Sequence, residues 1–205
     1  FIEKAHGRSS LISPRIIICV PYGLTQVERK AVRESALSAG AREVFLIEEP
    51  MAAAIGAGID IREPKGHLVV DIGGGTTEIG VVSLGGLVLS KSIRTAGDKI
   101  DQNIVNYVRK KYNLLIGERV SEEIKINIGT ALTLEKELTM VVNGRDQVEG
   151  LLSSVELTSE DVREAMKEPL KEIAEALRDV LEQMPPDLAG DIVNHGIILT
   201  GGGAL

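Results

Sequence analysis

The sequence predicts an α/β fold, because short apolar strands alternate with helical segments and two of the strands lead directly into glycine-rich loops. The first loop, Gly73-Gly-Gly-Thr-Thr77, follows the apolar run Leu68–Ile72. The second loop, Thr200-Gly-Gly-Gly-Ala204, follows the apolar run Ile197–Leu199. Because each loop directly follows an apolar strand, these two loops are the candidate ligand-binding part of the chain.

Composition narrows the class of protein. The chain has 205 residues, of which 43% are apolar and 26% charged, as in an ordinary folded protein. A net charge of −7, with no Trp, two Phe and three Tyr, argues against a nucleic-acid partner. The single Cys19 lies in an apolar run, and we expect it to be a small core residue. The sequence has no apolar stretch of spanning length and no signal peptide, so the expected compartment is the cytoplasm. Both ends indicate a fragment of a longer protein.

The first part of the chain predicts a βαβ unit. Ile16–Val20 and Val44–Ile47 are expected to be parallel strands. The helix between them begins with the capping box Thr25–Glu28 and ends at Gly40. A thin helix of small residues follows, with Pro50 at its first turn. Its small residues permit either tight packing within one domain or a crossing between two lobes, with Glu49 facing the cleft between them.

The remaining elements are predicted from similar signals. The strands Leu68–Ile72, Glu78–Leu84 and Leu87–Arg94 form a meander with its second turn at Gly85-Gly86. A helix is expected after Asp98, with Ile100, Ile104 and Val108 toward the core, and a shorter one at Glu122–Ile128. A long helical region is expected between the cap at Thr158 and Pro185-Pro186, and Pro169 should kink or divide it. Asn143-Gly144 is a strong hairpin signal and is expected to be the turn of a small antiparallel insertion.

The first glycine loop carries the residue types that bind a phosphate and its cation. Its glycines allow unusual backbone angles, leave room for a bulky ligand and can direct several N–H groups at a phosphate. The two threonines add hydroxyl donors, and the aspartate before the loop offers a carboxylate to a hydrated divalent cation. The alternative is a tight hairpin turn, which the aspartate and the second glycine loop make less favourable. The candidate residues are Asp71, Gly73, Gly74, Gly75, Thr76 and Thr77.

Several motifs in order resemble one known family. Val70-Asp-Ile-Gly-Gly-Gly-Thr-Thr77 resembles the second phosphate-binding loop of the actin-like ATPases, and Leu199-Thr-Gly-Gly-Gly-Ala204 resembles their adenosine-binding loop. The segment from Phe45 to Gly58 narrows the resemblance to the MreB family of bacterial actins. Thr25–Ser35 and Pro185–Ile192 also resemble that family. The resemblance implies a partial actin-like ATPase fold, which is ribonuclease H-like, with an incomplete first lobe and most of a second lobe.

The resemblance also implies a domain division. Residues 1–59 would be part of the first lobe, with the interlobe helix at 49–58. Residues 60–95 and 158–205 would form the core of the second lobe, and residues 96–157 its small subdomain. The family's N-terminal phosphate loop, an Asp-x-Gly-Thr hairpin, is missing from this sequence, so residues 1–205 alone would lack half of the phosphate clamp.

Phosphate and catalytic roles follow from the same resemblance. The backbone N–H groups of Gly74, Gly75 and Thr76 would bind the β- and γ-phosphates of ATP. Asp71 would hold Mg²⁺ through water, and Glu49 would position the attacking water. The alternative for Glu49 is a helix-start charge stabilised by the helix dipole.

Further residues would bind the rest of the nucleotide. Glu122 and Lys125 would contact the ribose and the adenine; the alternative is a solvated ion pair, since they stand three residues apart on one helix. Gly97 would approach the nucleotide beside Asp98, which is equally suited to cap the following helix. The adenosine would lie against the second loop, which comprises Gly201, Gly202, Gly203 and Ala204.

The resemblance finally implies a cytoskeletal task. A polymerising ATPase on the inner face of the cell membrane would guide cell-wall synthesis and maintain rod shape. Leu11 and Ile12, two apolar residues in a polar segment, would bind the membrane, although core packing is the commoner explanation for such residues. Two alternatives share the glycine loops: a heat-shock-type chaperone ATPase and a metabolite kinase.

Overall fold

The structure is a computed structural model that describes residues 13–205, and its internal contacts divide the chain into two compact units. The first unit comprises the chain up to Val70, Glu78–Ser92 and Met184–Ile198. The second unit comprises Asp71–Thr77, Ile93–Gln183 and Leu199–Leu205. These boundaries differ from the lobes implied by the family resemblance, and that lobe assignment stays a prediction.

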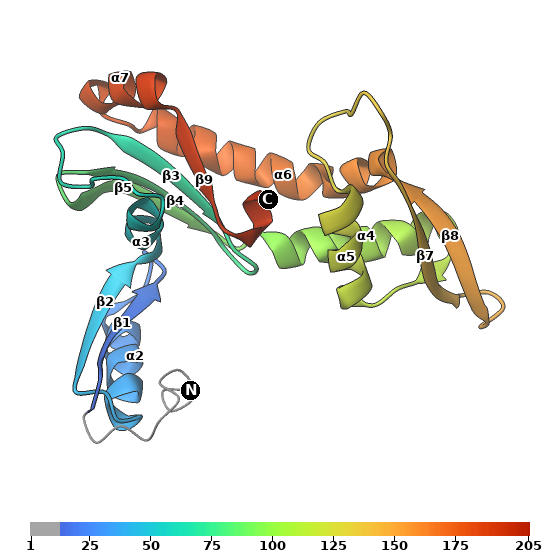
Figure 1. Cartoon of the computed structure of the whole chain (residues 1–205), viewed down its shortest axis with the longest axis horizontal. Coiled ribbons are helices and arrows are strands. Elements are labelled where there is room, and N and C mark those ends of the chain that lie inside the picture. The colour runs from blue at the N-terminus through green and yellow to red at the C-terminus, as the bar shows by residue number, and fades with distance from the viewer. Residues whose placement is uncertain (1–12) are drawn as a thin grey trace. The chain divides into compact units, whose positions relative to one another are not determined.

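The first unit begins with the predicted βαβ arrangement. Strands β1 (Arg15–Val20) and β2 (Glu43–Glu48) pair in parallel, and helix α2 (Gln26–Ser38) connects them (Figure 1). The capping box is confirmed, because the Glu28 N–H donates to the Thr25 hydroxyl at 3.3 Å and the Thr25 N–H donates to the Glu28 carboxylate at 2.8 Å. The prediction that Cys19 is a core residue is wrong for the described part of the chain, where its side chain is exposed.

Helix α3 (Glu49–Gly56) packs closely on strand β4 (Thr77–Ser83). A Cβ placed on Gly80 would lie 2.5 Å from the Cβ of Pro50, so no larger residue fits beneath the start of the helix. Ala54 is fully buried in the same cluster. The small residues of this helix therefore serve tight packing within the first unit.

A four-stranded sheet has the order β5-β4-β3-β9, with β3 at His67–Ile72, β5 at Gly86–Ile93 and β9 at Ile197–Thr200. The predicted meander is confirmed, but its second turn is one residue earlier than expected. Leu84 and Gly85 have positive φ angles of 50° and 73°, as a tight two-residue hairpin requires. Before β9, the sequence reading missed helix α7 (Pro186–His195), where the Asp191 carboxylate accepts the Gly66 N–H at 2.7 Å.

The second unit contains helices α4 (Gly97–Tyr112), α5 (Glu118–Ile128) and α6 (Ser159–Glu182), with a small sheet (Figure 1). That sheet has the order β6-β7-β8, with β6 at Leu114–Leu115, β7 at Thr139–Asp146 and β8 at Leu152–Thr158. Helix α6 is continuous through Pro169, so the proline does not divide it. The buried core comprises Ile100, Ile104, Val108, Leu114, Ile124, Ile128, Val142, Leu157, Val162, Ala165 and Met166.

The prediction of a hairpin turn at Asn143-Gly144 is wrong, because both residues lie inside β7. The turn comes after Asp146, whose carboxylate accepts the N–H groups of Val148 and Glu149. Gly144 is needed for a different reason: a Cβ there would lie 2.5 Å from the carbonyl oxygen of Leu115 in β6. A glycine inside a strand often marks such a close backbone approach.

None of the helices among residues 13–205 has both the length and the apolar character that crossing a membrane requires.

Candidate functional site

The structure brings the two glycine loops together at the ends of neighbouring strands β3 and β9. The Thr200 hydroxyl donates to the Asp71 carboxylate at 3.1 Å. The next residue, Gly201, has φ +87°, and a Cβ there would lie 2.2 Å from the carbonyl oxygen of Ile72. Gly203 is also in close contact, since its Cβ would lie 2.6 Å from the Cγ2 of Ile72. The second loop is therefore built against the strand that carries the first.

The first loop closes on itself through a hydrogen bond from the Gly73 N–H to the Thr76 carbonyl at 2.9 Å. The expectation of unusual backbone angles is wrong, because none of the three glycines has a positive φ. A Cβ on Gly73 would be tight, at 3.2 Å from the backbone carbonyl oxygen of Thr76, whereas one on Gly74 would lie 3.2 Å from the Asp98 carboxylate, a side-chain group that can shift. Gly75 is exposed, and its Cβ would meet nothing within 4 Å. The described fold thus imposes no requirement for glycine at position 75.

The start of α4 is attached to this loop. The Gly97 N–H donates to the Gly73 carbonyl at 3.0 Å, and the Asp98 N–H donates to the Gly74 carbonyl at 2.8 Å. Gly97 is buried, and a Cβ on it would lie 3.3 Å from the Gly73 carbonyl oxygen. The N-cap is Ala96, with no side-chain cap, so the alternative that Asp98 caps the helix is wrong. The loop uses its carbonyls for this attachment, and within the described residues the Gly74 and Gly75 N–H groups make no backbone hydrogen bond.

The two threonines of the loop differ in their surroundings. Thr76 is half-buried beside the exposed glycines. Thr77 is fully buried, and its hydroxyl donates to the Thr95 carbonyl at 2.7 Å. The Thr95 hydroxyl in turn donates to the Glu172 carboxylate on α6. The Thr77 hydroxyl is therefore committed to the scaffold and is poorly placed to donate to a ligand.

Lys125 has a partner that the sequence reading missed. Its ammonium lies 2.8 Å and 2.9 Å from the two carboxylate oxygens of Asp101 on α4. The alternative of a solvated ion pair between Glu122 and Lys125 is wrong, because Lys125 is paired with Asp101 and largely buried. One sequence feature could have indicated Asp101 as a site residue: it follows Asp98 by three positions, which places both carboxylates on one face of the helix.

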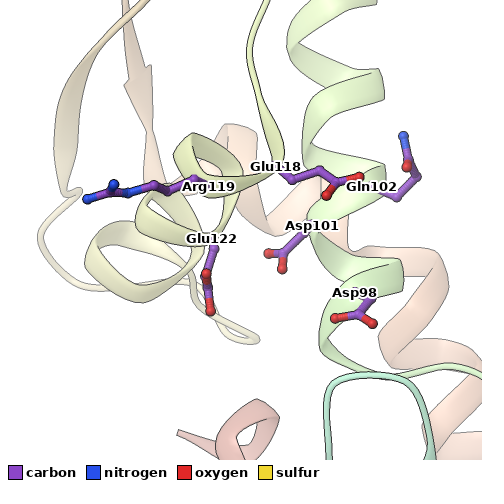
Figure 2. A pocket seen from close by; sticks show the side chains of 6 residues that line it. All are labelled: Asp98, Asp101, Gln102, Glu118, Arg119 and Glu122. Atoms are coloured by element: carbon purple, nitrogen blue, oxygen red, sulfur yellow. The ribbon is translucent and has the colours of Figure 1, made fainter.

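A cavity of about 410 Å³ lies between α4 and α5 (Figure 2). Its size is that of a small-molecule site. Its acidic lining suits hydroxyl and amino groups, which donate hydrogen bonds, better than phosphates. Glu122 was predicted, whereas the sequence reading did not assign Gln102, Glu118 or Arg119. The lining residues are Asp98, Asp101, Gln102, Glu118, Arg119 and Glu122.

The other predicted residues are distributed as follows. Gly202 and Ala204 lie in the short helical turn η1 (Gly202–Ala204) of the second loop. Glu49 is the first residue of α3, in the first unit. Leu11 and Ile12 lie outside the described residues. Across residues 13–205, no three His, Cys, Asp or Glu side chains gather into a ready metal site.

Comparison with known proteins identifies the family. The family model described as MreB/Mbl protein matches residues 1–205. The chain is 54% identical over 206 residues to the cell shape-determining protein MreB of Escherichia coli (strain K12), covering 100% of this chain and 59% of that protein. It is 47% identical over 205 residues to the cell shape-determining protein Mbl of Bacillus subtilis (strain 168), covering 100% and 62%. The chain thus spans about 60% of the length of these curated relatives.

Solved structures agree with this result. The crystal structure of MreB5 of Spiroplasma citri bound to ADP superposes with a TM-score of 0.93 and 38% identity, covering 98% of this chain and 62% of that chain. The crystal structure of Spiroplasma citri MreB 5 bound to AMPPNP gives a TM-score of 0.88 and 41% identity, with coverages of 91% and 56%. A MamK double helical filament, at 19% identity and a TM-score of 0.79, shows the likeness of fold alone. The actin-like α/β fold is thereby confirmed, and the chain belongs to the MreB/Mbl protein family.

Proposed function

We propose that this chain is the nucleotide-binding part of an actin-like protein that binds and hydrolyses ATP and assembles into filaments. The observation that carries the proposal is the junction of the two glycine loops. There Gly201 packs directly against the backbone of Ile72, and a Cβ on the exposed Gly75 would contact no protein atom within 4 Å. The related Spiroplasma proteins were crystallised with ADP and with AMPPNP, which supports a nucleotide as the ligand.

The two ends of a nucleotide suit different parts of this site. Phosphates suit the first loop, where Gly74, Gly75 and Thr76 offer backbone N–H groups and no side chain obstructs Gly75. The ribose and the base suit the acidic cavity, with Glu122 at its lining and Lys125 on the same helix. Gly201, Gly202, Gly203 and Ala204 would form the wall against the adenosine.

Hydrolysis would require a cation and a positioned water. Asp71 fits a Mg²⁺ that is held through water, because it is a hard oxygen donor next to the loop, already oriented by the Thr200 hydroxyl. A bound Mg²⁺ would neutralise charge on the β- and γ-phosphates. Glu49 would orient the attacking water, an assignment that rests on the family resemblance and on its place at the start of α3.

In the cell, the filament would maintain rod shape and guide the cell-wall synthesis machinery. This task is suggested by the relatives, which are described as cell shape-determining proteins. The filament would lie on the cytoplasmic side of the inner membrane. A heat-shock-type chaperone and a metabolite kinase remain as alternatives; each would hydrolyse or transfer the phosphate of ATP without forming a polymer.

Nucleotide-gated assembly is tested with Gly75→Asp in the full-length gene product. We expect wild type to sediment as polymer with Mg-ATP and to remain soluble with Mg-ADP or without nucleotide. A Cβ at position 75 meets no protein atom, so the fold should survive the substitution. The charge of the new carboxylate would repel the phosphates and reduce nucleotide affinity at least tenfold, roughly 1.4 kcal/mol or more.

Gly75→Asn is the matched control, because it has nearly the same shape without the charge. It should lose less affinity than Gly75→Asp, and that difference should shrink at high salt. Wild-type protein that hydrolyses ATP but stays monomeric under every condition would favour the chaperone or the kinase.

Membrane attachment is tested with a Leu11→Ser, Ile12→Ser double variant. Losing two apolar side chains from a lipid contact should weaken liposome binding by about 3 kcal/mol, or more than a hundredfold, as measured by vesicle co-sedimentation. ATP-dependent assembly in the absence of vesicles should be retained. Unchanged vesicle binding would exclude these two residues as the anchor.

A further inference from the structure

The pair of Lys125 and Asp101 is the most enclosed charged contact beside the proposed site. The side chains are only 17% and 14% exposed, and the ammonium lies 2.8 Å and 2.9 Å from the two carboxylate oxygens. Figure 2 shows the Asp101 carboxylate directed from α4 toward α5. An ion pair removed from water to this extent depends strongly on both of its members.

The location of the ammonium suggests a task for this pair. The Lys125 Nζ donates to the Gly97 carbonyl at 3.4 Å, and a Cβ on Gly97 would lie 3.4 Å from it. Gly97 is the residue whose N–H holds the Gly73 carbonyl of the first loop. Asp101 therefore holds a flexible, four-carbon side chain at the junction of α4, α5 and the loop.

The position of Lys125 relative to the cavity matters for a ligand. Lys125 is not among the residues that line the cavity, but it follows Glu122 by three residues on α5, and both Glu122 and its own partner Asp101 line the cavity. Without Asp101, the lysine would lose its fixed position and would have to be ordered when the ligand binds.

We propose that Asp101 is a positioning residue that fixes Lys125 for contact with the nucleoside end of the bound nucleotide. This inference rests on the proposed function and adds to it a residue that neither the sequence reading nor the comparisons assign. In this role Asp101 acts through Lys125. Its removal should therefore affect binding of the nucleoside end more than binding of the phosphates.

The experiment compares Asp101→Asn with wild type in the full-length protein. Asn retains the shape and an acceptor oxygen but not the charge. We expect the Kd for a fluorescent ATP analogue to rise about tenfold, because an oriented contact is lost, while kcat at saturation stays within twofold. The Kd for inorganic tripolyphosphate, measured by competition, should also stay within twofold.

Two further variants separate positioning from a general loss of structure. In a Lys125→Met background, Asp101→Asn should have no additional effect on the Kd for the analogue, because the group that it positions is gone. Glu160→Gln removes the carboxylate of an exposed pair with Arg163 in the same unit, and its Kd should match wild type.

The outcomes are distinguishable. Unchanged or tighter binding of the ATP analogue by Asp101→Asn would overturn the inference. An equal loss of affinity for the analogue and for tripolyphosphate would also overturn it, because it would indicate general loosening of the site. If wild type binds no nucleotide, the proposed function fails instead.

Discussion

Gly201→Ala is expected to destabilise the folded protein by about 3 kcal/mol and to abolish measurable nucleotide binding. Two costs add. Its φ of +87° and ψ of 159° lie in a backbone region that is essentially restricted to glycine, so an L-residue there costs roughly 1–3 kcal/mol. The new Cβ would also lie 2.2 Å from the Ile72 carbonyl oxygen and 2.6 Å from the Asp71 carboxylate, and such overpacking costs about 1–3 kcal/mol.

Nucleotide binding should be lost because the clash involves the strand that leads into the first glycine loop as well as the second glycine loop. Ile72 directly precedes the first glycine loop, and Asp71 accepts the Thr200 hydroxyl. Relieving the contact would move the second loop away from β3. Urea unfolding and titration with a fluorescent ATP analogue would measure the two effects.

Gly202→Ala is the matched control for stability. Gly202 is the next residue, has no positive φ, and a Cβ on it would meet nothing within 4 Å. Its unfolding midpoint should stay close to that of wild type. Equal midpoints for the Gly201 and Gly202 variants would contradict the described packing of the second loop on β3.

Asp161→Ala is the second change with a large expected effect, because one buried carboxylate serves several donors. It accepts the hydroxyls of Tyr107 at 2.9 Å and Tyr112 at 2.7 Å, the ammonium of Lys111 at 2.5 Å and the N–H of Thr158 at 3.1 Å. Alanine would deprive these donors of their shared acceptor and remove the carboxylate half of the capping box of α6. The expected loss is about 3–5 kcal/mol, measured by urea unfolding.

Glu160→Ala is the control for this prediction. Glu160 is the neighbouring acid in the first turn of α6, but its partner Arg163 is a surface contact. Its loss should cost about 0–1 kcal/mol. A similar cost for both variants would show that the cluster around Asp161 contributes little to stability.

The hydrogen bonds of Asp161 also predict that the stability of the folded protein depends on pH. Burial acts to raise the pKa of Asp161, but the hydrogen bonds from Lys111, Tyr112, Thr158 and Tyr107 outweigh it and lower the pKa from 3.8 to about 2. Because the folded-state pKa is the lower one, the stabilisation is fully present above pH 4 and is lost as the pH falls from about 4 to about 2. In Asp161→Ala, the free energy of unfolding should fall less between about pH 4 and about pH 2 than in wild type, because the variant has no Asp161 carboxylate to protonate.

Local signals explain the part of the fold that could be predicted. The capping box at Thr25 depends on groups three residues apart, and the strand around Val69 depends on a run of apolar neighbours. Both are visible within a short window. The glycine loops are recognised in the same way, although the expected unusual backbone angles are absent, since none of Gly73–Gly75 has a positive φ.

The errors arose where a distant partner decides what a residue does. Asn143-Gly144 has the pattern of a turn, but Gly144 lies within β7 because the backbone of Leu115 passes against it. Thr77 has the pattern of a ligand-binding hydroxyl, but its donor is used by Thr95. Neither partner can be read from the local pattern.

The sequence by itself determined the strands of the βαβ unit and of the meander, the capped helices and the two glycine loops, because these depend on backbone preferences and on neighbours within about four positions. Only the tertiary structure placed Gly201 against Ile72, Lys125 against Asp101 and Asp161 among its donors. Apart from the bond between Asp161 and Thr158, those contacts join residues 24 to 129 positions apart. They exist because packing of the apolar strands and helices brings these side chains together, and close packing and unpaired polar groups then decide which residues each position accepts.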